Sequence, residues 1–218
     1  MSNANFKELL LDLLTLRAPP RKWRADTSNS ADTQRTSGMD HEALIRRAQS
    51  GDATAFAELL DLYYDTIYRF AWKWCRHPVN AQDIAQQACI KLAGSLAQYR
   101  FQAAFKNWLY RVVITCAQDW QRRQREAVET APTIEPSTEG TQTEDLIYIG
   151  QLLAQLERLG EGMKETALLV HAEGLSHAEA GEVLGVSEST ISWRIHTIRK
   201  HMCRQEGRKR FGHERVFV

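Results

Sequence analysis

The sequence predicts an all-α protein in which two small helical domains are joined by a flexible acidic linker, the second domain carrying a helix-turn-helix. Three observations support this prediction. Apolar residues recur at helical spacing from residue 40 to residue 125, and that stretch contains a single proline, Pro78. An acidic segment with two prolines interrupts the helical pattern at residues 126–145. Two helical patterns further on flank the turn residues Leu184-Gly185-Val186.

Residues 1–38 form an N-terminal extension. Leucines within residues 1–17 follow the rhythm of an amphipathic helix, whereas residues 18–38 are polar, contain Pro19-Pro20 and have too little apolar surface to order themselves. Two interpretations stay open. The segment is either a dispensable extension preceding a true start at Met39, or a docking helix for a partner. No secretory signal or membrane span is expected.

Residues 40–125 are predicted to form the first helical domain. The first helical pattern ends at Arg76-His-Pro-Val-Asn80, the second continues beyond it, and residues 99–105 form a loop before a third. The apolar positions of these patterns are Leu59, Leu60, Tyr63, Ile67, Phe70, Ala71, Trp74, then Ile84, Ala88, Ile90, Leu92, Leu96, then Trp108, Leu109, Val112, Val113, Cys116 and Trp120. We expect Trp108 and Trp120 to belong to the core.

The linker, residues 126–145, contains six acidic residues and no basic one. With two prolines, a glycine and several threonines, this composition is typical of a flexible, solvated segment. At the other end, residues 207–218 form a basic and then apolar tail, and Gly207 is predicted to end the last helix.

Residues 146–206 are predicted to form the second helical domain. Ser176 followed by Glu179 is a capping box that starts one helix, and Gly185 suits the left-handed conformation of a tight turn. Ser187 then caps a second helix, on which three isoleucines at i, i+4 and i+7 should face inward: Ile191, Ile195 and Ile198.

The rest of that second helix is polar and basic. The formal net charge of the whole chain is only +1, but residues 194–210 contain seven Lys or Arg and one acid, Glu206. Polar residues near the start of such a helix reach base edges, and later cations meet phosphates. The predicted DNA contacts are Ser187, Glu188, Ser189, Thr190, Ser192, Trp193, Arg194, His196, Arg199 and Lys200.

The sequence carries no pattern of a catalytic or metal site. The four cysteines lie far apart without a C-x-x-C pair, which is typical of buried thiols in a reducing compartment. Asp83 and Asp119 have no His or Cys companion in a recognisable arrangement. We therefore expect a protein that is not an enzyme and has no cofactor or metal.

Two series of residues together resemble a known family. The first domain contains Asn80-Ala-Gln-Asp83-Ile-Ala-Gln86 and Phe105-Lys-Asn-Trp108-Leu-Tyr-Arg111, and the second contains Glu173-Gly-Leu-Ser-His-Ala-Glu-Ala180 and Leu184-Gly-Val-Ser187. In this order they resemble the extracytoplasmic-function (ECF) sigma factors of the sigma-70 family, over roughly residues 40–125 and 146–204. Asn80, Gln82 and Gln87 stand where acids are common in that family. Further departures are Phe101 for a usual Gly, Thr115 for a common Asn, and Ser192-Trp193 for a frequent Lys-Ser.

The resemblance implies a separate role for each of the two domains. The second domain would read the −35 promoter element as a duplex, and the first would bind core RNA polymerase through Asp83, Gln86 and Gln87. A loop of aromatic and cationic groups can trap unstacked bases, and this loop would capture the −10 element. The residues predicted for that role are Tyr99, Arg100, Phe101, Gln102, Phe105, Lys106, Asn107, Arg111, Arg122 and Arg123.

The implied partners are core RNA polymerase, promoter DNA and an anti-sigma factor, often membrane-bound, and the implied location is the cytoplasm. The alternative is a stand-alone helix-turn-helix regulator in which residues 40–125 serve sensing or dimerisation. Such a regulator would bind its operator without polymerase.

Overall fold

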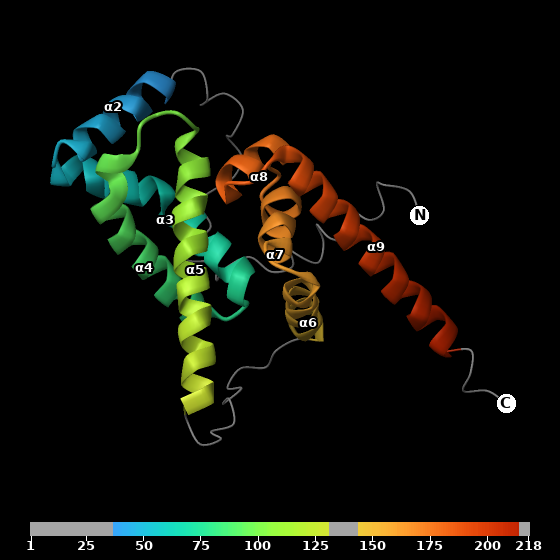
Figure 1. Cartoon of the computed structure of the whole chain (residues 1–218). Helices are drawn as coiled ribbons and strands as arrows, with labels where there is room; N and C mark the ends of the chain where they lie inside the picture. Colours follow the sequence, from blue (N-terminus) through green and yellow to red (C-terminus); the bar gives the residue numbers. More distant parts are fainter. Residues whose placement is uncertain (1–36, 131–143, 214–218) are drawn as a thin grey trace. The chain divides into compact units, whose positions relative to one another are not determined.

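A computed structural model describes residues 37–130 and 144–213. Within these two ranges every regular element is a helix, and the chain divides into two compact units between residues 141 and 142 (Figure 1). The helix predicted within residues 1–17, the polar segment up to residue 36, the linker from residue 131 to 143 and the tail from residue 214 lie outside the described residues.

The N-terminal unit is built around α3 (Ala53–Cys75), which packs against α2 (Ser37–Gln49), α4 (Pro78–Ser95) and α5 (Phe105–Thr130). A short 3₁₀ turn, η2 (Leu96–Gln98), follows α4. The apolar positions expected to pack do so with few exceptions, and fully buried side chains include Leu59, Ile67, Phe70, Ile84, Leu92 and Leu109. Burial of this stripe stabilises the helices far more than their intrinsic propensity does.

The ends of α3 follow from local chemistry. Asp52 caps its start by accepting hydrogen bonds of 3.0 Å from the backbone N–H groups of Thr54 and Ala55. At its end Arg76 adopts a left-handed conformation (φ 55°), and Pro78 occupies the first turn of α4, where no N–H is required. The predicted break after Cys75 is confirmed.

The predicted start of the linker is wrong. Residues 126–130 continue α5, so that helix extends five residues beyond the predicted end of the domain. No Gly or Pro interrupts the chain between Phe105 and Thr130, and Arg122 approaches Glu126 one turn later at 3.9 Å. An acidic composition suggested a solvated segment, but solvated glutamates are also good helix formers.

The C-terminal unit contains α6 (Glu144–Leu159), α7 (Met163–Ala167), a π-helical turn η3 (Leu168–Ala172), α8 (His177–Leu184) and α9 (Glu188–His213). Its core is formed by Leu152, Leu153 and Leu156 of α6, by Met163, Leu168 and Leu169, and by the isoleucines of α9. The predicted helix end at Gly207 is wrong, because α9 continues through it to His213. A glycine inside a helix costs only about 1 kcal/mol, and its neighbours are good helix formers.

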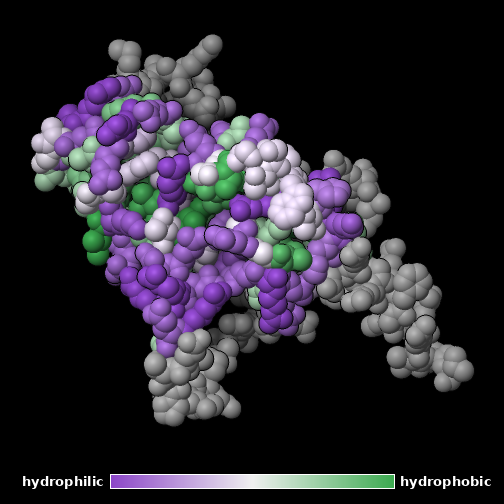
Figure 2. Space-filling view, viewed as in Figure 1, coloured by the Kyte–Doolittle hydropathy of each residue, from purple (hydrophilic) through white to green (hydrophobic). Residues whose placement is uncertain are grey.

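The face drawn in Figure 2 is mostly hydrophilic, with several apolar areas among the polar ones. Among the described residues, the large hydrophobic side chains that are exposed are Leu62, Val79, Ile90, Tyr148 and Trp193. No described helix is long and apolar enough to cross a bilayer. The described residues also contain no group of three His, Cys, Asp or Glu side chains that could hold a metal ion.

Candidate nucleic-acid interface

Helix α8, capped by Ser176, is joined to α9 by a tight turn at residues 185–187. The Ser176 hydroxyl accepts from the Glu179 N–H (3.2 Å), and the Glu179 carboxylate accepts from the Ser176 N–H (2.8 Å), so the predicted capping box is confirmed. Gly185 has φ +68°, as expected for the turn. A Cβ at Gly181 would lie 2.7 Å from the Val186 carbonyl oxygen, so the close return of the chain requires glycine there as well.

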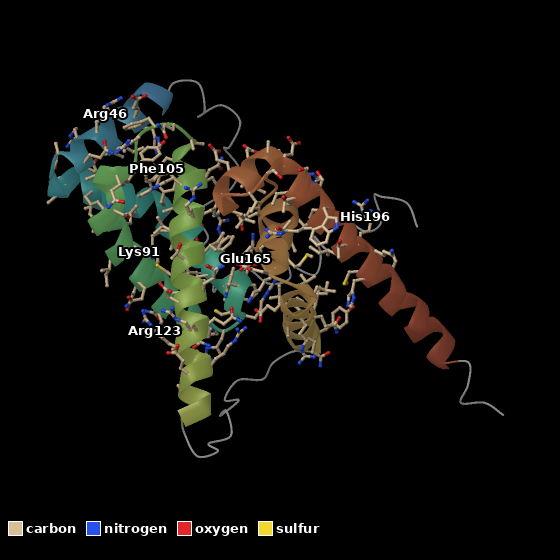
Figure 3. The ribbon with its side chains drawn as sticks, viewed as in Figure 1. Arg46, Lys91, Phe105, Arg123, Glu165 and His196 are labelled. Atoms are coloured by element: carbon tan, nitrogen blue, oxygen red, sulfur yellow. The ribbon has the colours of Figure 1, made fainter. Side chains whose placement is uncertain are left out.

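α9 has a buried face and an exposed face on opposite sides. Ile191, Ile195 and Ile198 are buried, as predicted. On the opposite side four exposed residues follow each other at i, i+4, i+7 and i+11: Ser189, Trp193, His196 and Lys200. We call these four residues the outer stripe; Figure 3 labels His196 on it. Trp193 is 59% exposed, which is unusual for so large an apolar side chain.

The other predicted contacts of α9 surround the outer stripe unevenly. Ser187 caps the helix by accepting from the Thr190 N–H (3.2 Å), and Ser187, Glu188 and Ser192 are exposed. Thr190, Arg194 and Arg199 are half-buried. The Ser192 hydroxyl lies 2.9 Å from Nδ1 of His177, the first residue of α8. His177 was not among the predicted contacts, since only the fold brings residues fifteen positions apart together.

Arg194 lies on the flank of α9 and faces α7. Its Nη1 is 3.5 Å from the hydroxyl of Thr166, a fully buried residue. Its guanidinium covers Gly162, where an added Cβ would lie 2.3–2.6 Å from the guanidinium carbon and both terminal nitrogens. The structure therefore separates Arg194 from the outer stripe.

In the N-terminal unit, three of the predicted −10 contacts are core residues. Tyr99, Phe105 and Asn107 are buried, and the Tyr99 hydroxyl donates to the Ala103 carbonyl (2.7 Å). Their side chains have no free face on which a base could stack, which corrects the expectation that Tyr99 and Phe105 contact DNA directly. The remaining predicted residues are exposed or, for Phe101, half-buried: Arg100, Gln102, Lys106, Arg111, Arg122 and Arg123.

The buried aromatics form a cluster beneath the loop. Phe105 contacts Tyr63 (ring centroids 4.9 Å) and Tyr99 (5.2 Å). Trp108, which is half-buried, contacts Phe105 and Tyr99. Trp120 is half-buried too, so neither tryptophan is as enclosed as predicted. The Tyr63 hydroxyl lies 2.6 Å from His41 Nε2. Burial raises the pKa of Tyr63 to about 12 and lowers the pKa of His41.

Two side chains of α2 contact the segment between Leu96 and Phe101. The Gln49 side-chain amide donates to the carbonyls of Leu96 (2.9 Å) and Tyr99 (2.7 Å), and the Arg46 guanidinium lies 4.3 Å from the centre of the Phe101 ring. Figure 3 shows Arg46 and Phe105 at the same end of the N-terminal unit. Neither Arg46 nor Gln49 was predicted, because helix periodicity carries no signal for contacts between a helix and a distant loop.

The predicted polymerase contacts Asp83, Gln86 and Gln87 are all exposed on α4. Val79 and Ile90 lie on the same face, 59% and 66% exposed. Ile90 was expected to continue the apolar packing pattern and instead faces outward. This face, which we call the α4 surface (Val79, Asp83, Gln86, Gln87, Ile90), is therefore more apolar than the sequence suggested.

The family profile described as "ECF sigma factor" matches residues 39–208, and thus both units. The chain belongs to the ECF sigma factor family. It is 25% identical over 181 residues to the ECF RNA polymerase sigma factor SigW of Bacillus subtilis, covering 74% of this chain and 94% of that protein. It is 28% identical over 174 residues to the RNA polymerase sigma-H factor of Pseudomonas aeruginosa, covering 73% and 90%.

The fold is similar to that of CnrH solved in complex with the cytosolic domain of CnrY, with a TM-score of 0.57 and 21% identity over 76% of this chain and 96% of that one. By its family profile and its relatives, the protein is a sigma factor, a protein that directs transcription initiation by RNA polymerase.

One departure of this sigma factor from the family has a structural counterpart. Phe101, which stands where glycine is usual, has φ +59°, a left-handed conformation that favours glycine. Its ring packs 4.7 Å from Tyr99 and under Arg46. In this sigma factor, side-chain contacts thus offset a backbone cost that glycine would avoid.

Proposed function

We propose that this sigma factor recognises promoters with two separate surfaces, α8 and α9 acting as a helix-turn-helix on the −35 element and the loop at residues 99–104 acting on the −10 element. The observation that carries the proposal is the outer stripe of α9, an exposed row of one serine, one tryptophan, one histidine and one lysine directly opposite three buried isoleucines.

For the −35 element, the outer stripe enters the major groove of the duplex. Ser189 and Trp193 near the start of α9 contact base edges, and Lys200 meets a phosphate. Ser192 contacts the DNA from a position fixed by His177.

For the −10 element, the exposed side chains Arg100 and Gln102 and the half-buried ring of Phe101 receive the unstacked strand. Lys106, Arg111, Arg122 and Arg123 follow along α5 and neutralise phosphates. Tyr99, Phe105 and Asn107 act from beneath by holding the loop in shape.

The α4 surface is the proposed binding site for core RNA polymerase, in the cytoplasm. Its two exposed apolar residues suit a stable protein contact, and Asp83 adds a charge at its centre. An anti-sigma protein that covers this surface would silence the factor. The acidic segment between the two units, whose residues 131–143 lie outside the described ones, is proposed to be a tether near the path of the RNA, where its charge would mimic nucleic acid.

In vitro transcription with purified core polymerase and a promoter library tests the proposal. Addition of the chain should produce initiation at promoters sharing −35 and −10 elements. Footprinting separates the alternative: a stand-alone regulator protects its operator without polymerase, whereas the proposed factor protects promoter DNA only when polymerase is present. Failure both to bind polymerase and to change initiation would contradict the proposal.

A further inference from the structure

We propose that Gly162 and Thr166 are positioning residues for −35 recognition, which hold the guanidinium of Arg194 against α7 so that it fixes the orientation of α9 instead of contacting DNA. This inference rests on the proposed role of α9 in reading the −35 element. It assigns a function to the N-cap residue of α7, Gly162, and to one residue within α7, Thr166.

The shape of the chain at Gly162 carries the first part of the argument. Gly162 has φ +75°, and the space that a Cβ would fill holds the Arg194 guanidinium, at 2.3 Å to Nη1 and 2.4 Å to Cζ. No other residue type leaves this space open. An alanine at position 162 would force the end of the Arg194 side chain to move, because that end is the more flexible partner.

The second part is the polar contact beyond Gly162. The Arg194 Nη1 donates to the Thr166 hydroxyl at 3.5 Å, a long contact, and Thr166 is fully buried in α7. A planar guanidinium that covers backbone on one side and reaches a buried hydroxyl has little freedom left. Helices α7 and α9 pack against each other, and the Arg194–Thr166 contact is part of that packing.

The third part is the direction in which Arg194 points. The preceding residue, Trp193, lies on the outer stripe, and the following residue, Ile195, lies in the core. Arg194 lies on the side of α9 between these two faces. An arginine that read DNA would need its guanidinium on the exposed side, as Lys200 has its ammonium group. The geometry thus predicts that Arg194 controls where the stripe lies while making no phosphate contact of its own.

The chain offers a matched control for the glycine. Gly174 belongs to the same unit and has nearly the same φ (+74°), yet a Cβ there would have nothing within 4 Å. Gly162→Ala and Gly174→Ala therefore both place an alanine at a positive φ, and only the first displaces Arg194. Thr166→Val and Thr166→Ser form a second pair, since only serine keeps the hydroxyl.

The experiment measures binding of the full chain with core polymerase to a promoter with its −35 element and to one with that element scrambled. Gly162→Ala, Arg194→Ala and the double variant should each lower the ratio of the two affinities by on the order of threefold to tenfold, without adding up. Gly174→Ala should change it less. Thr166→Val should lower the ratio, and Thr166→Ser should restore it.

Salt dependence gives an independent reading. Arg194→Ala should leave the slope of log affinity against log salt concentration unchanged, whereas Lys200→Ala should reduce it by about one, the value for one lost phosphate contact. An equal reduction for Arg194→Ala would overturn the inference. So would a double variant with additive losses, or variants that alter only the unfolding midpoint and keep the affinity ratio.

Failure of the proposed function has a different signature. In that case the unaltered chain itself shows no preference for the intact −35 element, while the unfolding free energies of Gly162→Ala, Arg194→Ala and the double variant remain coupled.

Discussion

At the scale of single residues, Phe101 combines an unfavourable backbone with favourable side-chain contacts. A left-handed conformation costs a non-glycine residue about 1–2 kcal/mol, and the ring gains contacts with Tyr99 and Arg46. Phe101→Ala should lose the ring and keep the strain, whereas Phe101→Gly should lose both. We expect the free energy of unfolding of the glycine variant to exceed that of the alanine variant by about 1 kcal/mol. Its urea midpoint should be higher accordingly. Equal stabilities would mean that the backbone at this position is not strained.

Trp193 leads to a prediction about the bases that the outer stripe meets. Its exposed ring offers mainly apolar surface, and the apolar group of the major groove is the thymine methyl. The thymines of the −35 element are replaced by uracil one at a time. Replacement at one of these positions should weaken binding of the polymerase complex by roughly fourfold, which corresponds to about 0.8 kcal/mol for one methyl-sized group.

The Trp193→Ala variant should not respond to that replacement of thymine by uracil, and Ser189→Ala should respond as the unaltered chain does. If Trp193→Ala responded in full, the ring would have another role, such as contact with a protein.

At the scale of elements, the rings of His41, Tyr63 and Phe105 contact one another and join α2, α3 and α5. Phe105 is buried, and the other two are half-buried. Because burial lowers the pKa of His41, the unfolded chain binds its proton more readily than the folded chain below the ordinary value of 6.5. Stability contributed by neutral His41 is therefore complete above pH 6.5 and is lost as pH falls through the lowered pKa.

Urea unfolding of the full chain between pH 5 and pH 7.5 measures this loss. The unfolding free energy of the unaltered chain should decrease more steeply toward acid than that of His41→Gln, since all other titrating groups are shared. Identical pH profiles would contradict a role for His41 in this dependence.

The elements also mark how far sequence reasoning extends. The capping box at Ser176, the turn at Gly185 and the isoleucines of α9 were predictable, because each depends on residues a few positions apart. Helix lengths were not: α5 and α9 both continue past their predicted ends, since solvated glutamates and one glycine permit a helix without requiring it. The position of Arg194 on Gly162 was also unpredictable, because it depends on how two helices pack.

At the scale of the whole molecule, the α4 surface should determine whether the factor reaches polymerase. Asp83→Ala and Ile90→Ser should each weaken binding to core polymerase, by about tenfold for a residue near the centre of an interface. Their helical content and unfolding midpoint should stay unchanged, because both side chains are exposed. Asp61→Ala, an exposed acid on α3, is the control and should bind normally.

Titration of fluorescently labelled chain with core enzyme gives these affinities. If Asp83→Ala and Ile90→Ser bound as tightly as the control, polymerase would have to engage a different face.

The π-helical turn at Leu168–Ala172 has a consequence for the relation of this chain to others. A π turn holds one more residue than an α turn, so ordinary winding between Ala167 and Ser176 would require a chain shorter by one. A related protein that lacks one residue here would have an α-helical turn in place of the π-helical turn, and its loops would keep their lengths. If the gap were placed before Gly162 or after Arg194, one of these two residues would be matched with the wrong neighbour by one position.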